Sequence, residues 1–308
     1  MDYFGIKPHQ AGVGNVYYVI QAAQEEYADT VDAYQKTYSD GSSAIQNTIT
    51  TALTASQAER NDYIIVFPDP ADYDEGATLT MNKASVHLIC PAGIGGSYGC
   101  STRAATIDPN AAAAAITITG RGVEVAGFWI RGYTEKVCIT NSGVGVWIHH
   151  NDCAVTCTTS VAGGIYTSGV GSTIEKNFIF SNSGAGTWLY GISAPGGATR
   201  THVIGNVVTV GNASTCTDGI TMAADNGYMQ MGVCSGNQVV EVPDCGGGVG
   251  TATLSHGITT GVGVLTTDNR VAIATHGNAY RTGGVDMYLE NYASNAIGGQ
   301  LAYVDSTT

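Results

Sequence analysis

A two-part phrase repeats through residues 123–277 and constrains the fold more than any other feature of the chain. Its first part places a small residue before Ile, at 137–139, 163–165, 190–192, 218–220 and 256–258. Its second part is an apolar pair, a short polar step and an Asn, with the Asn at Asn151, Asn177, Asn206, Asn237 and Asn269. Successive Asn are 26, 29, 31 and 32 residues apart, and the first three Ile intervals are 26, 27 and 28. Two phases that advance together indicate a solenoid.

The repeats predict strands rather than helices. They contain short runs of β-branched and apolar residues with Gly and Asn at the breaks, and no amphipathic window of ten residues appears. Equivalent strands stacked on one another predict parallel sheets that wind around a cylinder. We expect Ile and Val inside, and an Asn column at a bend, where each amide bonds the next. An antiparallel sandwich with Asn in its turns is the alternative.

Composition excludes several classes of protein. Although 42 of the 308 residues are Gly and only 12% are charged, 44% are hydrophobic, which argues against disorder. The net charge of −13, without a Lys/Arg cluster, argues against nucleic acid as a partner. No apolar run of 18 residues predicts a membrane span. The first residues lack a basic start followed by an apolar core, so we expect no signal peptide and synthesis in the host cytoplasm.

The N-terminal third differs from the repeats. Residues 1–38 read as an arm, with a strand at 16–20 and an amphipathic helix marked by Tyr27, Val31 and Tyr34. Residues 39–46 are expected to open a second helix, whose apolar face includes Ile45 and Ile49. A buried strand at 63–67 and another at 86–90 follow.

This order resembles the N-terminal cap of right-handed parallel β-helices of the pectate-lyase-like superfamily, phage tailspikes included. In that family an Asp-Gly…Ala-Ile-Gln helix plugs the open end and a Val-x-Phe-Pro strand begins the coil. The matching residues here are Asp40, Ile45, Ile49 and Phe67. The resemblance implies an all-β fold, a right-handed parallel β-helix with a short helical N-terminal cap. The expected parts are an arm (1–38), the capped β-helix (39–290) and a C-terminal tail (291–308).

One row of residues could carry chemistry. If the Ile columns align, Tyr190, Asp218 and His256 stack on adjacent rungs, about 4.8 Å apart. The surroundings of Asp218 and His256 also resemble fragments of the polygalacturonase motifs Asn-Thr-Asp and Gly-His-Gly. That family's Asp-Asp pair and Arg-x-Lys are absent, so no catalytic residue is favoured. If the chain is an enzyme, these three residues are expected to act.

The other reactive side chains favour structural roles. His149 and His150 are adjacent on a strand and are expected to point to opposite faces, so we expect no metal site and no cofactor. The eight cysteines show no C-x-x-C zinc spacing and are expected to be reduced core residues, although Cys153 and Cys157 could pair locally. The tryptophans suit either sugar stacking or packing; they are Trp129, Trp147 and Trp188.

We therefore expect a structural virion protein of a bacteriophage, a capsid decoration or tail component on the virion surface. By resemblance it would form homotrimers and contact other virion proteins such as a capsid shell. The first alternative is a polysaccharide-degrading hydrolase or lyase, a depolymerase like those of tailspikes. The second is a carbohydrate-binding adhesin without catalysis. Glycans are possible ligands under either alternative.

Overall fold

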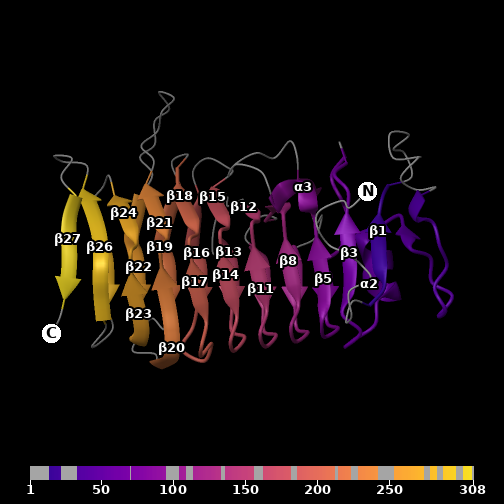
Figure 1. Cartoon of the computed structure of the whole chain (residues 1–308). Helices are drawn as coiled ribbons and strands as arrows, with labels where there is room; N and C mark the ends of the chain where they lie inside the picture. The colour runs from indigo at the N-terminus through magenta and orange to yellow at the C-terminus, as the bar shows by residue number, and fades with distance from the viewer. Residues whose placement is uncertain are drawn as a thin grey trace.

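The strands of the protein follow one another along a single axis from the N-terminal to the C-terminal end (Figure 1). The computed structural model describes residues 14–21, 33–69, 71–94, 104–108, 114–132, 136–155, 162–181, 186–211, 214–222, 228–241, 253–273, 278–282, 287–295 and 301–306. Within them no helix is long and apolar enough to cross a membrane.

Each coil contributes three strands, and each strand pairs in parallel with its equivalent in the neighbouring coil. Two ladders form one sheet of 19 strands, and the third is a separate sheet of eight. The eight-stranded sheet contains β4 (Leu79–Met81), β7 (Ile116–Ile118), β10 (Val137–Asn141), β13 (Ala162–Thr167), β16 (Thr187–Ala194), β19 (Thr215–Met222), β22 (Thr253–Thr260) and β25 (Asn278–Thr282).

The 19-stranded sheet holds the other two ladders. The first contains β1 (Val16–Val19), β2 (Ile45–Gln46), β3 (Asp62–Val66), β5 (Val86–Ile89), β8 (Glu124–Ala126), β11 (Trp147–His149), β14 (Thr173–Glu175), β17 (His202–Ile204), β20 (Tyr228–Ser235), β23 (Val262–Thr267) and β26 (Met287–Asn295). The second contains β6 (Ala105–Ile107), β9 (Phe128–Arg131), β12 (Asp152–Val155), β15 (Phe178–Ser181), β18 (Val207–Val210), β21 (Gln238–Glu241) and β24 (Arg270–Ile273). The predicted all-β fold of parallel sheets is confirmed.

The small residue before each Ile has a packing reason. Ile139, Ile165, Ile192, Ile220 and Ile258 lie in register and are fully buried. A side-chain carbon on the glycine before Ile220 would lie 2.4 Å from Cγ1 of the valine on the facing second ladder and 2.6 Å from the carbonyl oxygen of the next rung. Only a residue without a side chain fits at this glycine, and the Ile that follows it fills the core.

The recurrent Asn form a continuous hydrogen-bonded column inside the bend between the first and second ladders. The side chain of Asn206 illustrates one step: its Nδ2 donates to Oδ1 of Asn237 at 3.0 Å and to the carbonyl of Ile174 at 2.9 Å. Its Oδ1 accepts from the backbone N–H and Nδ2 of Asn177, both at 3.0 Å. All members are fully buried, and the column continues one step past the repeats to Asn291.

The helix expected to open at residues 39–46 begins later than the sequence pattern predicts. Ile45 lies in β2, and α2 (Ile49–Ala55) starts after the N-cap Thr48, which forms a capping box with Thr51. Glu75 accepts from the first backbone N–H groups of α2, and Lys83 donates to its last carbonyls at 2.6–2.8 Å. Both ends of this short helix are therefore capped by side chains from outside it. A second short helix, α3, spans Pro91–Ile94.

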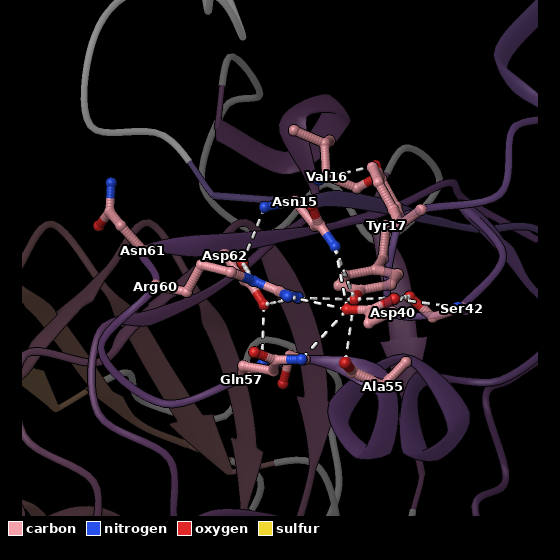
Figure 2. Close-up of polar contacts among 12 residues, drawn as sticks. Asn15, Val16, Tyr17, Asp40, Ser42, Ala55, Gln57, Arg60, Asn61 and Asp62 are labelled. Carbon is pink, nitrogen blue, oxygen red and sulfur yellow. Dashed lines mark hydrogen bonds and ion pairs between the residues drawn. The ribbon is translucent and has the colours of Figure 1, made fainter.

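Asp40 does not start a helix but belongs to an ion-pair cluster at the N-terminal end (Figure 2). Arg60 donates to both carboxylate oxygens of Asp62, at 2.6 and 2.7 Å, to Asp40 at 2.8 Å and to the hydroxyl of Tyr17 at 2.9 Å. The side chain of Asp62 is fully buried and also accepts the backbone N–H groups of Asn15 and residue 57. The cluster thus joins β1, the segment around Asp40, the end of α2 and β3.

The first and last strands that the structure describes extend the 19-stranded sheet. β1 pairs in parallel with β2 and β3, and Phe67 packs partly buried against the small cluster of Val16, Ile65 and Ile89. β26 extends the first and second ladders, and β27 (Leu301–Ser306) pairs with it in antiparallel orientation. The helix expected around Tyr27 falls mostly outside the described residues. The division into arm, β-helix and tail stays a prediction.

The described cysteines are buried and form no disulfide. Because Cys153 is free, it does not form the local pair with Cys157 that its spacing allows. Burial raises the pKa of the Cys234 thiol to about 12, which makes it unreactive at neutral pH. Cys90, Cys138 and Cys216 also form no disulfide, whereas Cys100, Cys157 and Cys245 lie outside the described residues.

Candidate functional site

The structure places the three residues of the predicted row on consecutive strands of the eight-stranded sheet. Tyr190 of β16 pairs with Asp218 of β19, which pairs with His256 of β22. The glycines that follow Tyr190 and Asp218 face the packed interior, where a side-chain carbon would meet valines of the second ladder. The row is therefore set by the same rung motif that builds the core.

Asp218 and His256 form a partly buried pair. Their side chains are 16% and 18% exposed, and Nδ1 of His256 lies 3.3 Å from Oδ1 of Asp218. That oxygen also accepts a hydrogen bond from the hydroxyl of Thr259 at 2.6 Å. The distance of 3.3 Å fits an ion pair if the imidazole is protonated. The two groups are not aligned as a hydrogen bond, and the buried Nδ1 has no hydrogen-bond partner among the described residues.

Tyr190 supplies a phenol at the end of the row. Burial, and secondarily the neighbouring Tyr166, raise its pKa to about 12, so the hydroxyl stays protonated at neutral pH. The ring lies toward the preceding rung, where Gly163 makes room for it: a side-chain carbon at Gly163 would lie 2.3 Å from Cε2 of Tyr190. The rings of Tyr166 and Tyr190 are 6.2 Å apart.

The row offers one carboxylate. The neighbouring positions in register on the same strands are Tyr166, Ser193, Thr221 and Thr259, which are uncharged. Glycoside hydrolysis generally needs two carboxyl groups on either side of the scissile bond. A carboxylate, an imidazole and a neutral phenol instead supply an orienting group, a base and an acid.

A second polar cluster, absent from the sequence predictions, lies on the first ladder. Glu124 of β8 contacts a histidine with each carboxylate oxygen: Nδ1 of His87 at 2.6 Å and Nε2 of His149 at 2.8 Å. The ring of Tyr63 stacks on His87 with centroids 4.3 Å apart, and Trp147 stacks on His149 at 3.9 Å. This cluster was missed from the sequence because finding it requires the register between β5, β8 and β11. The irregular spacing of residues 68–123 does not reveal that register.

Glu124 is held in its ionised form. Burial raises its pKa, but hydrogen bonds from His149 and His87, together with the charges of these residues, outweigh that effect and lower the pKa from 4.5 to about 2. Because a carboxylate only accepts, the facing nitrogens of both histidines are donors. This fixes which nitrogen of His149 carries a proton.

The expectation that His149 and His150 point to opposite faces is wrong. His150 has a left-handed backbone with φ of 53°, which ends the strand and brings its Nδ1 to 2.8 Å from Nδ1 of His149. Within the described ranges, no group of three or more His, Cys, Asp or Glu is arranged to hold a metal ion.

The tryptophans fall into three different environments. Trp188 is fully buried and Trp147 is 41% exposed. Trp129 is half-buried and packs edge-on against Phe180 with ring centroids 5.2 Å apart. Of the two roles considered from the sequence, packing describes Trp188, and an accessible stacking surface exists at Trp147.

Comparison with known proteins adds a family and a structural match. Residues 121–234 match the model of a family described as disaggregatase related, and no curated protein matches the chain. Among solved structures the chain is similar to the alginate lyase from Paenibacillus sp. str. FPU-7, with 12% identity, a TM-score of 0.39, and coverage of 84% of this chain and 96% of that one. The parallel ladders and the family match of residues 121–234 confirm the resemblance to pectate-lyase-like parallel β-helices.

The prediction of a structural virion protein was wrong. Residues 121–234 match a family described as disaggregatase related, and that description names no part of a virion. This match gives no support to a bacteriophage, a capsid or a trimer. The error arose because the likeness of residues 39–93 to tailspike caps concerns the fold, which many unrelated functions share.

Proposed function

We propose that the chain is a polysaccharide-degrading enzyme that cleaves by elimination, with Tyr190, Asp218 and His256 as its catalytic row. The observation that carries the proposal is the register of these three residues on consecutive parallel strands. The family model of disaggregatase-related proteins spans Tyr190 and Asp218. No cofactor or metal is part of the proposal.

Each residue has a role that fits its surroundings. Asp218 would hold the imidazole of His256 through Nδ1, which leaves Nε2 free to act as a base. The base would remove the proton on the sugar carbon beside a uronate carboxyl group. The electron pair then forms a carbon–carbon double bond and the glycosidic C–O bond breaks. The leaving oxygen takes a proton from the Tyr190 phenol, whose ring must turn from its position over Gly163 toward Asp218 to deliver it. Elimination needs neither a water molecule nor a second carboxylate, in keeping with the single carboxylate of the row.

The test compares products and variants on alginate, polygalacturonate and hyaluronan. We expect an unsaturated product, detected by its ultraviolet absorbance, for at least one of these polymers. Asp218→Asn should lower kcat/KM by about 100-fold or more, because the imidazole of His256 loses the carboxylate that orients it, and Tyr190→Phe should lower it by a similar factor, because it removes the acid. Thr215→Ala, on the same strand as Asp218 but outside the row, is the matched control and should keep full activity.

Two results would contradict the proposal. Cleavage that Asp218→Asn leaves unchanged would place the chemistry elsewhere in the molecule. New reducing ends without a double bond would show hydrolysis, which requires a carboxylate that the row lacks.

We also propose that the coil is right-handed and that α2 covers its N-terminal end. Parallel crossover connections are right-handed in nearly all proteins. Support for the cap comes from the burial of Ile49 and Ala52 of α2 against the core at the first rungs. Such a cover would shield apolar residues that the open end of a solenoid otherwise exposes.

A further inference from the structure

Trp147 stands out on the first ladder because its large apolar ring faces solvent. Its side chain is 41% exposed, on an outward column where it pairs with Glu124 on one rung and Thr173 on the next. An indole exposed at the protein surface is a feature of binding sites for ligands with one apolar and one polar side.

The ring is held in place by a chain of polar contacts. One face of Trp147 stacks on His149, with centroids 3.9 Å apart and planes inclined by 27°. His149 is in turn fixed by Glu124 through Nε2 at 2.8 Å. Since His149 covers one face of the indole, the opposite face is the one available to a ligand. A ring fixed before binding loses little entropy when a ligand stacks on it.

The same chain prepares an acceptor beside the ring. With Glu124 ionised, Nε2 of His149 donates to it, so in neutral His149 the Nδ1 atom is an acceptor. His150 then donates from its own Nδ1 across the 2.8 Å contact, and its Nε2 carries a lone pair. That Nε2 makes no hydrogen bond to any residue that the structure describes, and His150 is only half-buried. This Nε2 can accept a hydrogen bond from a hydroxyl group.

A cation completes the surroundings. Lys176 follows β14, is 53% exposed and lies 3.4 Å from Glu175. The backbone N–H of His150 donates to the carbonyl of Glu175 at 3.2 Å, which places the lysine segment next to the histidine. Together these groups present an apolar ring, a hydroxyl acceptor and a positive charge.

We propose that Trp147, His150 and Lys176 form a second saccharide-binding site on β11 and β14, away from the catalytic row. The row lies on the eight-stranded sheet, whereas β11 and β14 belong to the 19-stranded sheet. One sugar unit of the polymer stacks its C–H face on the free face of Trp147. Because His149 lies between Trp147 and His150, a hydroxyl of a different unit donates to Nε2 of His150, and Lys176 attracts a uronate carboxylate. The inference shares only its ligand class with the proposed function and does not require cleavage.

Binding is measured in the Asp218→Asn background, by electrophoretic retardation in gels that contain alginate, polygalacturonate or dextran. Trp147→Ala should weaken binding about 3- to 10-fold, as expected for loss of one aromatic stack, and Trp147→Phe should keep part of it. His150→Ala should weaken binding to all polymers that bind, and Lys176→Ala only to the two polyuronates. Leu265→Ala is the matched control, because Leu265 lies in the same outward column and is 37% exposed.

Equal retardation of the Trp147→Ala and Leu265→Ala proteins on every polymer would overturn the inference, as would no retardation of the parent. An unchanged melting temperature excludes misfolding as the cause of lost binding. The two proposals fail separately. If the wild-type chain cleaves nothing but Trp147→Ala still loses retardation, the proposed function fails alone. If cleavage depends on Asp218 while Trp147→Ala binds normally, the second site fails alone.

Discussion

At the scale of single residues, Glu124 shows how an outward position on a β-helix can become partly buried and still carry a charge. Its two oxygens each face a histidine nitrogen, and its side chain is 13% exposed. An isolated carboxylate at that depth would favour its neutral form. The two histidines reverse this preference, so the charge of Glu124 stabilises the fold at neutral pH.

The stabilisation should depend on pH in a defined direction. The folded-state pKa of about 2 lies below the ordinary value of 4.5, so the contribution is full above pH 4.5 and is lost as the pH falls toward 2. Glu124→Gln should lower the free energy of unfolding by about 2 kcal/mol at pH 7. We expect the difference from wild type to shrink below pH 4.5, as measured by urea unfolding.

Glu175→Gln is the matched control for this prediction. Glu175 lies on the same face, one rung from His149, is 24% exposed and pairs only with Lys176 among the salt bridges of the described residues. Its substitution should change stability by less than about 0.5 kcal/mol. A constant difference between Glu124→Gln and wild type from pH 7 to pH 3 would contradict the assigned pKa.

At the scale of elements, the Asn column joins one rung to the next. Each internal member donates to the next Asn and to a carbonyl of the preceding rung, and its oxygen accepts from the previous Asn. Asn206→Ala would leave the buried N–H of Asn177 without an acceptor. It should lower the free energy of unfolding by about 3 kcal/mol, measured by guanidinium unfolding.

Gln238→Ala is a suitable comparison for Asn206→Ala, because Gln238 directly follows a column residue but is exposed. Its change should stay within about 0.5 kcal/mol. A similar loss in both variants would mean that the column contributes no more than any other position at the bend.

The strands and the Asn column could be predicted because they depend on local requirements that recur every rung. A buried bend needs a side chain with both a donor and an acceptor, and the crowded interior position before Ile needs a small residue, Gly in most rungs and Cys138 in one. The start of α2 was misplaced because Asp40 looks like an N-cap, while Thr48 and Thr51 form the capping box. The Glu124 cluster depends on register across coils of unequal length, which residues 68–123 do not reveal.

At the scale of the whole molecule, the ion-pair cluster at the N-terminal end secures the first rungs. Arg60 connects the fully buried Asp62 to Asp40 and Tyr17, which lie in segments far apart in sequence (Figure 2). Arg60→Gln would leave the Asp62 charge buried and without its ion-pair partner. The free energy of unfolding should fall by about 3 kcal/mol.

The loss should be local at first, because each rung contacts only its neighbours. Hydrogen exchange should accelerate in residues 14–66 of the Arg60→Gln protein, while β16, β19 and β22 keep their protection. Arg121→Gln provides the control, since Arg121 is 71% exposed and lies 3.8 Å from Glu59. Uniform acceleration along the whole chain would show that the molecule unfolds as one unit.

The placement of Tyr190, Asp218 and His256 on consecutive strands limits how such a molecule can grow during evolution. Duplication of one complete coil before β16 or after β22 would lengthen the protein and extend its surface, with the Asn column continued and the row intact. Duplication between β16 and β22 would move the phenol or the imidazole one rung farther from the carboxylate. We expect gains and losses of coils to be tolerated at both ends of this protein and excluded from residues 190–256.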